Sequence, residues 1–175
     1  MRSARISPIN VHDFAQLLTL LLPATGQLKE RALQSPRRRA HERVAPGADG
    51  ANRTLIAMLA GSYVRPHVHD AAQEHDVEIL LAIEGETGIV TFDRSGRVAS
   101  AESIGVGQAY AVSAHVYHTA FPLGNSCIFL EAAVLSAKGY DKRYHDTFPE
   151  EFDDRCSLLL ESWLQEIARN CEKEF

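Results

Sequence analysis

The sequence predicts a single, mainly β domain, a small sandwich or barrel with helices at both ends. Between residues 53 and 137, short β-branched and aliphatic runs alternate with glycine-containing polar turns. The chain has 175 residues, of which 45% are hydrophobic, enough for one core. We expect a helical and extended lead-in at 1–52, the β-barrel at 53–137 and a C-terminal loop with an amphipathic helix at 138–175, all in one structural domain.

The N-terminal region predicts two short helices. Apolar residues recur at the spacing of one helical face in residues 10–22, and Pro23 ends this first helix because proline cannot donate the next hydrogen bond. A second helix is predicted from Gly26 to Leu33. It ends before Pro36, since the residue preceding a proline avoids helical angles. An extended segment through Arg37-Arg38-Arg39 follows.

Eight β-strands follow in the central region. Their separators include the turns 84–86 and 93–96, whose glycines suit hairpins, so we expect an antiparallel meander. The predicted strands are Thr54–Ala60, Tyr63–His69, Val77–Ile83, Gly88–Phe92, Val98–Ile104, Ala109–Val112, His118–Phe121 and Cys127–Leu135.

The C-terminal segment predicts a loop around Phe148-Pro149 and then a helix over Asp153–Cys171. One apolar face of this helix would pack against the barrel or a partner chain. Its members are Leu159, Trp163, Ile167 and Cys171, with Leu160 and Leu164 beside them.

Charge and cysteine content restrict the class of protein. A net charge of -5 argues against general nucleic-acid binding, which needs a surplus of Lys and Arg. No apolar stretch is long enough for a membrane span. Three widely separated cysteines indicate neither a disulfide framework nor a zinc ribbon, and a cytoplasmic location fits best. The Arg37-Arg38-Arg39 run is either a solvated or ion-paired turn or a contact for an anionic ligand.

His67 and His69 are the most informative pair. Alternate residues of a strand point to the same face, so two imidazoles could converge on one metal ion. Two histidines on a solvated strand face are the alternative. A carboxylate would complete the site, and Glu78 is favoured because a packed apolar strand follows it, whereas loop carboxylates cost more entropy to hold. The candidates are Asp70, Glu74, Asp76 and Glu78.

His118 is the fourth candidate ligand, since a short strand continues from it about forty residues downstream. His115 competes for this role but lies in the expected turn. A core or surface histidine is the alternative for each.

These residues together resemble the cupin superfamily. Its first motif, G-x5-H-x-H followed by E-x6-G, matches Gly61, His67, His69, Glu78 and Gly85, whereas Glu74 has Leu81 at the glycine position. The spacer from His69 to Glu78 is longer than usual, which implies an inserted loop. The second motif, G-x5-P-x-G-x2-H, matches Gly107 and His118, with Ser113 in place of proline and His115 in place of glycine.

A closer resemblance is to the small WbuC-type cupins of bacterial surface-polysaccharide gene clusters, over roughly residues 28–140. It is carried by Ser35-Pro36-Arg37-Arg38-Arg39 and Arg65-Pro66-His67-Val68-His69. The superfamily resemblance implies a jelly-roll-like cupin barrel, one divalent metal ion held by His67, His69, Glu78 and His118, and a homodimer. The metal could be Fe, Mn, Ni, Cu or Zn, because affinity order alone does not choose among them.

Substrate determinants are expected beside the metal ligands. Tyr63 and Arg65 share strand parity with His67 and should face the cavity, and Tyr110 is a third candidate for substrate binding. Arg65 would bind a carboxylate or phosphate, or form a structural salt bridge. The candidates for catalysis are His115, as a general acid or base, and Tyr117.

Three functions fit these residues, each with a small-molecule ligand. The first is a metal-dependent isomerase, epimerase or lyase that acts on a small substrate such as a sugar or nucleotide sugar. The second is an Fe(II) dioxygenase, since four protein ligands leave room for substrate and O₂ on a six-coordinate ion. The third is a non-catalytic sensor or binding module.

Overall fold

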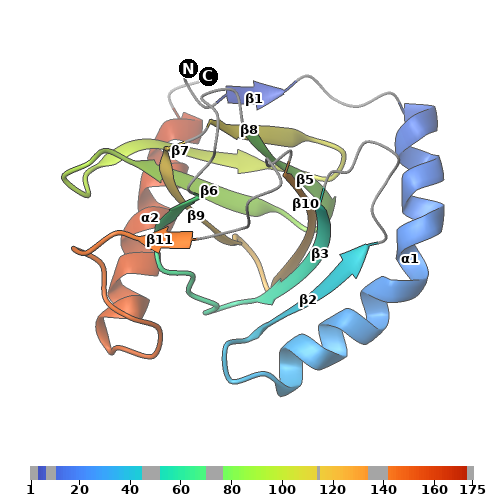
Figure 1. Ribbon diagram of the computed structural model, residues 1–175, viewed down its shortest axis with the longest axis horizontal. Coiled ribbons are helices and arrows are strands. Elements are labelled where there is room, and N and C mark those ends of the chain that lie inside the picture. The colour runs from blue at the N-terminus through green and yellow to red at the C-terminus, as the bar shows by residue number, and fades with distance from the viewer. Residues whose placement is uncertain are drawn as a thin grey trace.

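The computed structural model describes residues 4–6, 11–44, 52–69, 77–113, 115–133 and 142–172. Two antiparallel sheets face each other, and a helix covers the outer side of each (Figure 1). The six-stranded sheet has the order β1 (Ala4–Ile6), β8 (Ala109–Ser113), β5 (Val77–Glu84), β10 (Ser126–Ala133), β3 (Asn52–Leu59) and β2 (Arg39–Val44). The five-stranded sheet has the order β11 (Lys142–Tyr144), β4 (His67–His69), β9 (Tyr117–Pro122), β6 (Thr87–Phe92) and β7 (Val98–Ile104).

The strand order is that of a jelly roll, and the expected meander is wrong. Among the described strands, the pairs β2–β3 and β6–β7 are the sequential neighbours that hydrogen-bond to each other, while the other strands pair with partners distant in sequence. From β3 onward the chain passes to the opposite sheet after nearly every strand. The mainly β, jelly-roll-like fold class is confirmed, as two facing sheets and not as one closed ladder.

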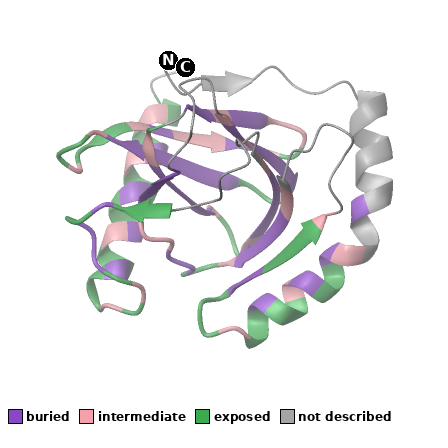
Figure 2. Cartoon of the chain, in the orientation of Figure 1, coloured by how far each residue is buried: buried purple, intermediate pink, exposed green. Residues whose placement is uncertain are grey.

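The described core forms three apolar layers: one between α1 (Val11–Gln34) and the six-stranded sheet, one between the two sheets, and one between the five-stranded sheet and α2 (Arg155–Cys171). In β5, Leu80 and Ala82 face the space between the sheets, whereas Leu81 and Ile83 face α1. A central strand therefore buries both of its faces, which is why the strand runs are continuously apolar. Buried residues accordingly fill central strands such as β5 and β6, while the edge strands β2 and β11 are mostly exposed (Figure 2).

The N-terminal region forms one helix, α1, instead of two, and Pro23 lies inside it. A proline in a helix interior costs about 3 kcal/mol because it removes a backbone hydrogen bond. Packing opposes this cost, since Leu28 and Ala32 are buried against the six-stranded sheet. Burial of a large aliphatic side chain contributes roughly 1.5–3 kcal/mol.

Neither described helix is both long and apolar enough to cross a membrane.

The C-terminal helix, α2 (Arg155–Cys171), covers the outer face of the five-stranded sheet. Its buried stripe consists of Cys156, Leu160, Trp163 and Ile167. The predicted apolar face of this helix was wrong at two positions: Cys171 is exposed, and Leu164 is 37% exposed. The stripe follows the three- and four-residue steps of a straight helix, whereas a strict four-residue repeat drifts away from the sheet.

The arginine run fixes the C-terminal segment to the six-stranded sheet. Arg39 is buried in β2 and donates to the Tyr63 carbonyl at 2.8 Å and to the Glu151 carboxylate at 2.5 Å. Arg37 also contacts Glu151, at 3.0 Å. Of the two interpretations of this run, the structure shows the ion-paired turn.

Candidate metal centre

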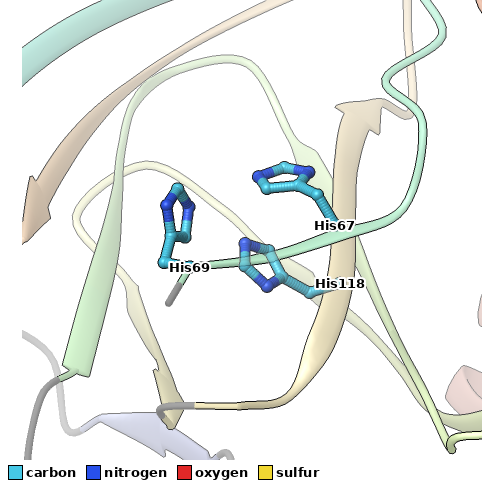
Figure 3. A group of neighbouring side chains, drawn as sticks. All are labelled: His67, His69 and His118. Atoms are coloured by element: carbon cyan, nitrogen blue, oxygen red, sulfur yellow. The ribbon is translucent and has the colours of Figure 1, made fainter. Parts of the chain in front are cut away.

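Three imidazoles converge on one space on the inner face of the five-stranded sheet (Figure 3). His67 and His69 are alternate residues of β4, and His67 is the direct cross-strand partner of His118 on β9. Both relationships place side chains on the same face of a sheet. One nitrogen from each ring lies within 4.8 Å of the others, and all three residues are buried.

Glu78 reaches the histidines from the opposite sheet. Its Oε2 atom lies 3.0 Å from Nε2 of His118 and 3.1 Å from Nε2 of His69. The side chain is 6% exposed. The start of β5 therefore supplies a carboxylate to a group that β4 and β9 build, which is the arrangement expected from the sequence.

Backbone contacts orient two of the rings. Nδ1 of His67 lies 3.1 Å from the Arg65 carbonyl, and Nδ1 of His118 lies 3.0 Å from the Val116 carbonyl. A carbonyl only accepts hydrogen bonds, so each Nδ1 carries the proton and donates. Each Nε2 lone pair is then left for the centre of the group, the common arrangement in metal-binding histidines.

The donor atoms fit a divalent cation. Among the described residues, Nε2 of His67 is buried without a hydrogen-bond partner, a costly state for a polar atom, and the buried Oε2 of Glu78 faces the nitrogens of His69 and His118. A bound ion would satisfy both. Three imidazole nitrogens and one carboxylate oxygen suit Fe, Mn, Ni, Cu or Zn.

Electrostatics differ between the two hydrogen-bonded imidazoles. Burial lowers the pKa of His67 well below its ordinary value, so this ring is neutral at pH 7. Burial acts in the same direction on His118 and is the largest single influence, but the charge and hydrogen bond of Glu78, together with the Val116 carbonyl, outweigh it and raise the pKa of His118. For Glu78, the effect of burial is likewise outweighed by the contacts with His118 and His69, and the carboxyl pKa lies well below its ordinary value.

A cavity of about 70 Å³ opens beside these residues between the two sheets. Its floor is apolar, and its wall carries ionisable groups from both edge strands. The lining includes Ile56, Met58, Leu80 and Phe129 on the floor, and Arg39, His41, Glu131, Lys142, Tyr144 and Glu151 in the wall, beside His67, Glu78 and His118.

The expected substrate-binding residues lie away from this cavity. Tyr63 packs against Trp163 of α2 with ring centroids 5.9 Å apart, and Arg65 donates to the His145 carbonyl at 3.1 Å. The parity argument was wrong because β4 begins only at His67, so residues 63–66 do not alternate as a strand. Tyr110 is buried in the core between the sheets, where its hydroxyl lies 3.2 Å from that of Ser100.

The candidates for catalysis also lie outside the lining of this cavity. His115 is exposed in a turn with a left-handed φ of 62°, and Tyr117 packs against His145 with ring centroids 4.5 Å apart. His115 occupies the glycine position of the second motif. The left-handed backbone explains why glycine suits that position.

Lys142 and Tyr144 are wall residues that the sequence analysis missed. Both belong to β11, in a segment expected to be a loop. A strand of three residues has too short an alternation to be recognised. The competing carboxylates Asp70, Glu74 and Asp76 lie outside the described residues.

The fold and the histidine group define a protein of the cupin fold. Oxalate oxidase in complex with the substrate analogue glycolate is similar in structure, with 12% identity and a TM-score of 0.50 over 63% of this chain and 56% of the other. Pumpkin seed globulin is similar with 9% identity and a TM-score of 0.50, over 63% of this chain and 29% of the other. At such identities the likeness shows the fold alone. The chain spans only 56% of the length of oxalate oxidase.

Sequence comparison gives less detail. Residues 23–104 match a family described as a domain of unknown function (DUF6016). No curated protein matches the chain. The WbuC-type assignment stays a prediction.

Proposed function

We propose that this protein binds one divalent metal ion through His67, His69, His118 and Glu78, and that the ion holds a small ligand in the adjacent cavity. The observation that carries the proposal is the convergence of buried donor atoms: Nε2 of His67 has no hydrogen-bond partner among the described residues, and Oε2 of Glu78 lies against the imidazole nitrogens of His69 and His118. Buried polar atoms without a partner are rare unless water or an ion satisfies them.

A metal-dependent enzyme is the function we favour. A bound ion would polarise a coordinated oxygen of the ligand, which serves isomerases, epimerases and lyases. This chain supplies neutral His67, an apolar floor that limits water, and ionisable groups in the wall of the cavity. A sugar or nucleotide-sugar substrate in surface-polysaccharide metabolism, a cytoplasmic location and a homodimer stay predictions.

The metal is tested by elemental analysis and by competition titration of the purified protein. We expect about one equivalent of metal in the wild type and at least a tenfold loss of affinity in Glu78→Gln and His118→Gln. His41→Gln is the matched control, because His41 lines the same cavity and is not among the proposed ligands. Its metal affinity should equal that of the wild type. A wild type without stoichiometric metal, or Glu78→Gln with unchanged affinity, contradicts the proposal.

Two other functions use the same metal site. An Fe(II) dioxygenase would consume O₂ only when both iron and substrate are present, which anaerobic iron loading followed by oxygen-electrode measurement would detect. A sensor would bind its ligand and release it unchanged. A thermal-shift screen of small acids, sugars and sugar nucleotides, followed by product analysis of each hit, separates the sensor from an enzyme.

A further inference from the structure

Strand β11 places two side chains beside the proposed metal ligands. In the antiparallel ladder with β4, Lys142 is the direct partner of His69 and Tyr144 is the direct partner of His67. Direct partners project to the same face of a sheet, so both residues lie on the metal side. The ring of Tyr144 lies 6.2 Å from that of His67, and the Arg65 guanidinium packs over it at 5.5 Å.

Lys142 differs from the other charged groups of the cavity wall. Arg39 is paired with Glu151, and Glu131 has an interaction of its own. Lys142 is exposed, and within the described part of the chain no carboxylate forms an ion pair with it. Its ammonium therefore brings to the lining of the cavity a positive charge that no carboxylate of the described residues pairs with.

His41 lies in the wall of the same cavity and adds no charge of its own. Partial burial and the positive charges of Arg39 and Lys142 lower the pKa of His41 to about 4. The imidazole is consequently neutral at pH 7.

We propose that Lys142 binds an anionic group of the ligand whose other end is coordinated by the metal, so that the ligand is a small acid with a second oxygen function. This inference rests on the proposed metal site. A cavity of about 70 Å³ accepts only a few non-hydrogen atoms, so the part of the ligand beside the proposed metal ligands is small, as in a small carboxylic acid. A lysine ammonium is a compact donor for a carboxylate.

Lysine on an edge strand has another use, because charge there prevents pairing with a second sheet edge. Arg143 offers a control for that role. It is the neighbouring residue of the same strand, is exposed, and alternates to the opposite face. A general edge-protecting charge could reside on either residue, whereas ligand binding requires Lys142.

The test uses calorimetric titration of the metal-loaded protein with malonate, and with neutral malonamide for comparison. We expect Lys142→Gln to weaken malonate binding by about tenfold or more, and Lys142→Arg to retain most of the affinity. Arg143→Gln should bind malonate like the wild type. Malonamide affinity should be the same in all four proteins.

Metal content, measured on the same samples, separates the two proposals. If the wild type holds no metal, the metal site fails and this inference fails with it. If metal is present but the wild type does not bind malonate, or Lys142→Gln binds it as tightly as the wild type, the role of Lys142 alone is overturned. A comparable loss in Arg143→Gln would also overturn it, since the effect would then be general electrostatics.

Discussion

Oε2 of Glu78 lies 3.0 Å from Nε2 of His118, although the two residues belong to different sheets. Without metal, the carboxylate and the imidazole stabilise each other's charged forms, which raises the pKa of His118 and lowers that of Glu78. A metal ion would replace the proton that His118 holds. The relationship therefore links metal binding to pH.

Metal binding at pH 6.5 should release protons, more than half of one per ion from His118. The pKa of His118 is raised above its ordinary value of 6.5, so the metal-free protein still holds that proton there. The lowered pKa of His67 means that this ring has no proton to release. Below pH 6.5, metal affinity should fall by about tenfold per pH unit. Calorimetry in buffers of different ionisation enthalpy measures the number of protons.

A matched variant assigns that proton. Glu78→Gln removes the charge that helps to raise the pKa of His118, so its weaker metal binding should release fewer protons at pH 6.5. Equal proton release in the two proteins would show that the Glu78–His118 pair is not its source.

The left-handed turn at His115 predicts an unusual order of stability. With φ at 62°, a side chain with Cβ costs about 1 kcal/mol relative to glycine. His115→Gly should therefore be more stable than His115→Ala by about 1 kcal/mol, the reverse of the order at most sites. Thermal unfolding of both variants measures the difference.

The same variants test a catalytic role for His115. If the imidazole acts as an acid or base, both variants should lose turnover while they keep full metal content. If His115→Ala were as stable as His115→Gly, the explanation by a strained turn would be contradicted. Unchanged turnover would exclude the catalytic role.

Gly85 ends the first cupin-like motif for a steric reason. A Cβ atom at this position would lie 2.4 Å from the carbonyl oxygen of Ser126, and φ is +70°. Because the obstacle is backbone, Gly85→Ala should lower the free energy of unfolding by about 2–4 kcal/mol. Gly124→Ala is the control, since a Cβ atom there would meet nothing within 4 Å and its φ is not left-handed. Urea denaturation compares the two; equal losses would contradict the steric explanation.

Trp163 should be the most important side chain of α2 for stability. It is 2% exposed and packs among four aromatic rings, those of Tyr63, Phe92, Phe121 and Phe148. Trp163→Ala should cost about 3–5 kcal/mol. Leu164→Ala, on the same helix but 37% exposed, should cost less than about 1 kcal/mol. Chemical denaturation gives both values.

Sedimentation of Leu164→Ala tests the predicted homodimer. If α2 packs only against the sheet of its own chain, this variant should keep the oligomeric state of the wild type. A dimer that dissociates in Leu164→Ala, with stability otherwise unchanged, would show that the exposed side of α2 forms an interface.

Local patterns in the sequence were enough to predict the positions of the side chains in the proposed metal site. Period-two alternation was enough to predict that His67 and His69 point to the same face of a sheet, because side chains alternate between the two faces along a strand. The packed strand after Glu78, and the cupin-like spacing from Glu78 to Gly85, predicted a carboxylate that the structure places beside His69 and His118. The strand continuing from His118 likewise indicated its place.

Tertiary structure decided the rest. Tyr63 and Arg65 do not line the cavity, because the chain becomes a strand only at His67, where it pairs with β9. Pro23 is tolerated inside α1 because packing on the sheet offsets the lost hydrogen bond. Lys142 lies beside His69 through a pairing across more than seventy residues, which no local pattern encodes. The sequence by itself thus predicted the four side chains that meet between the sheets, while long-range packing decided what surrounds them.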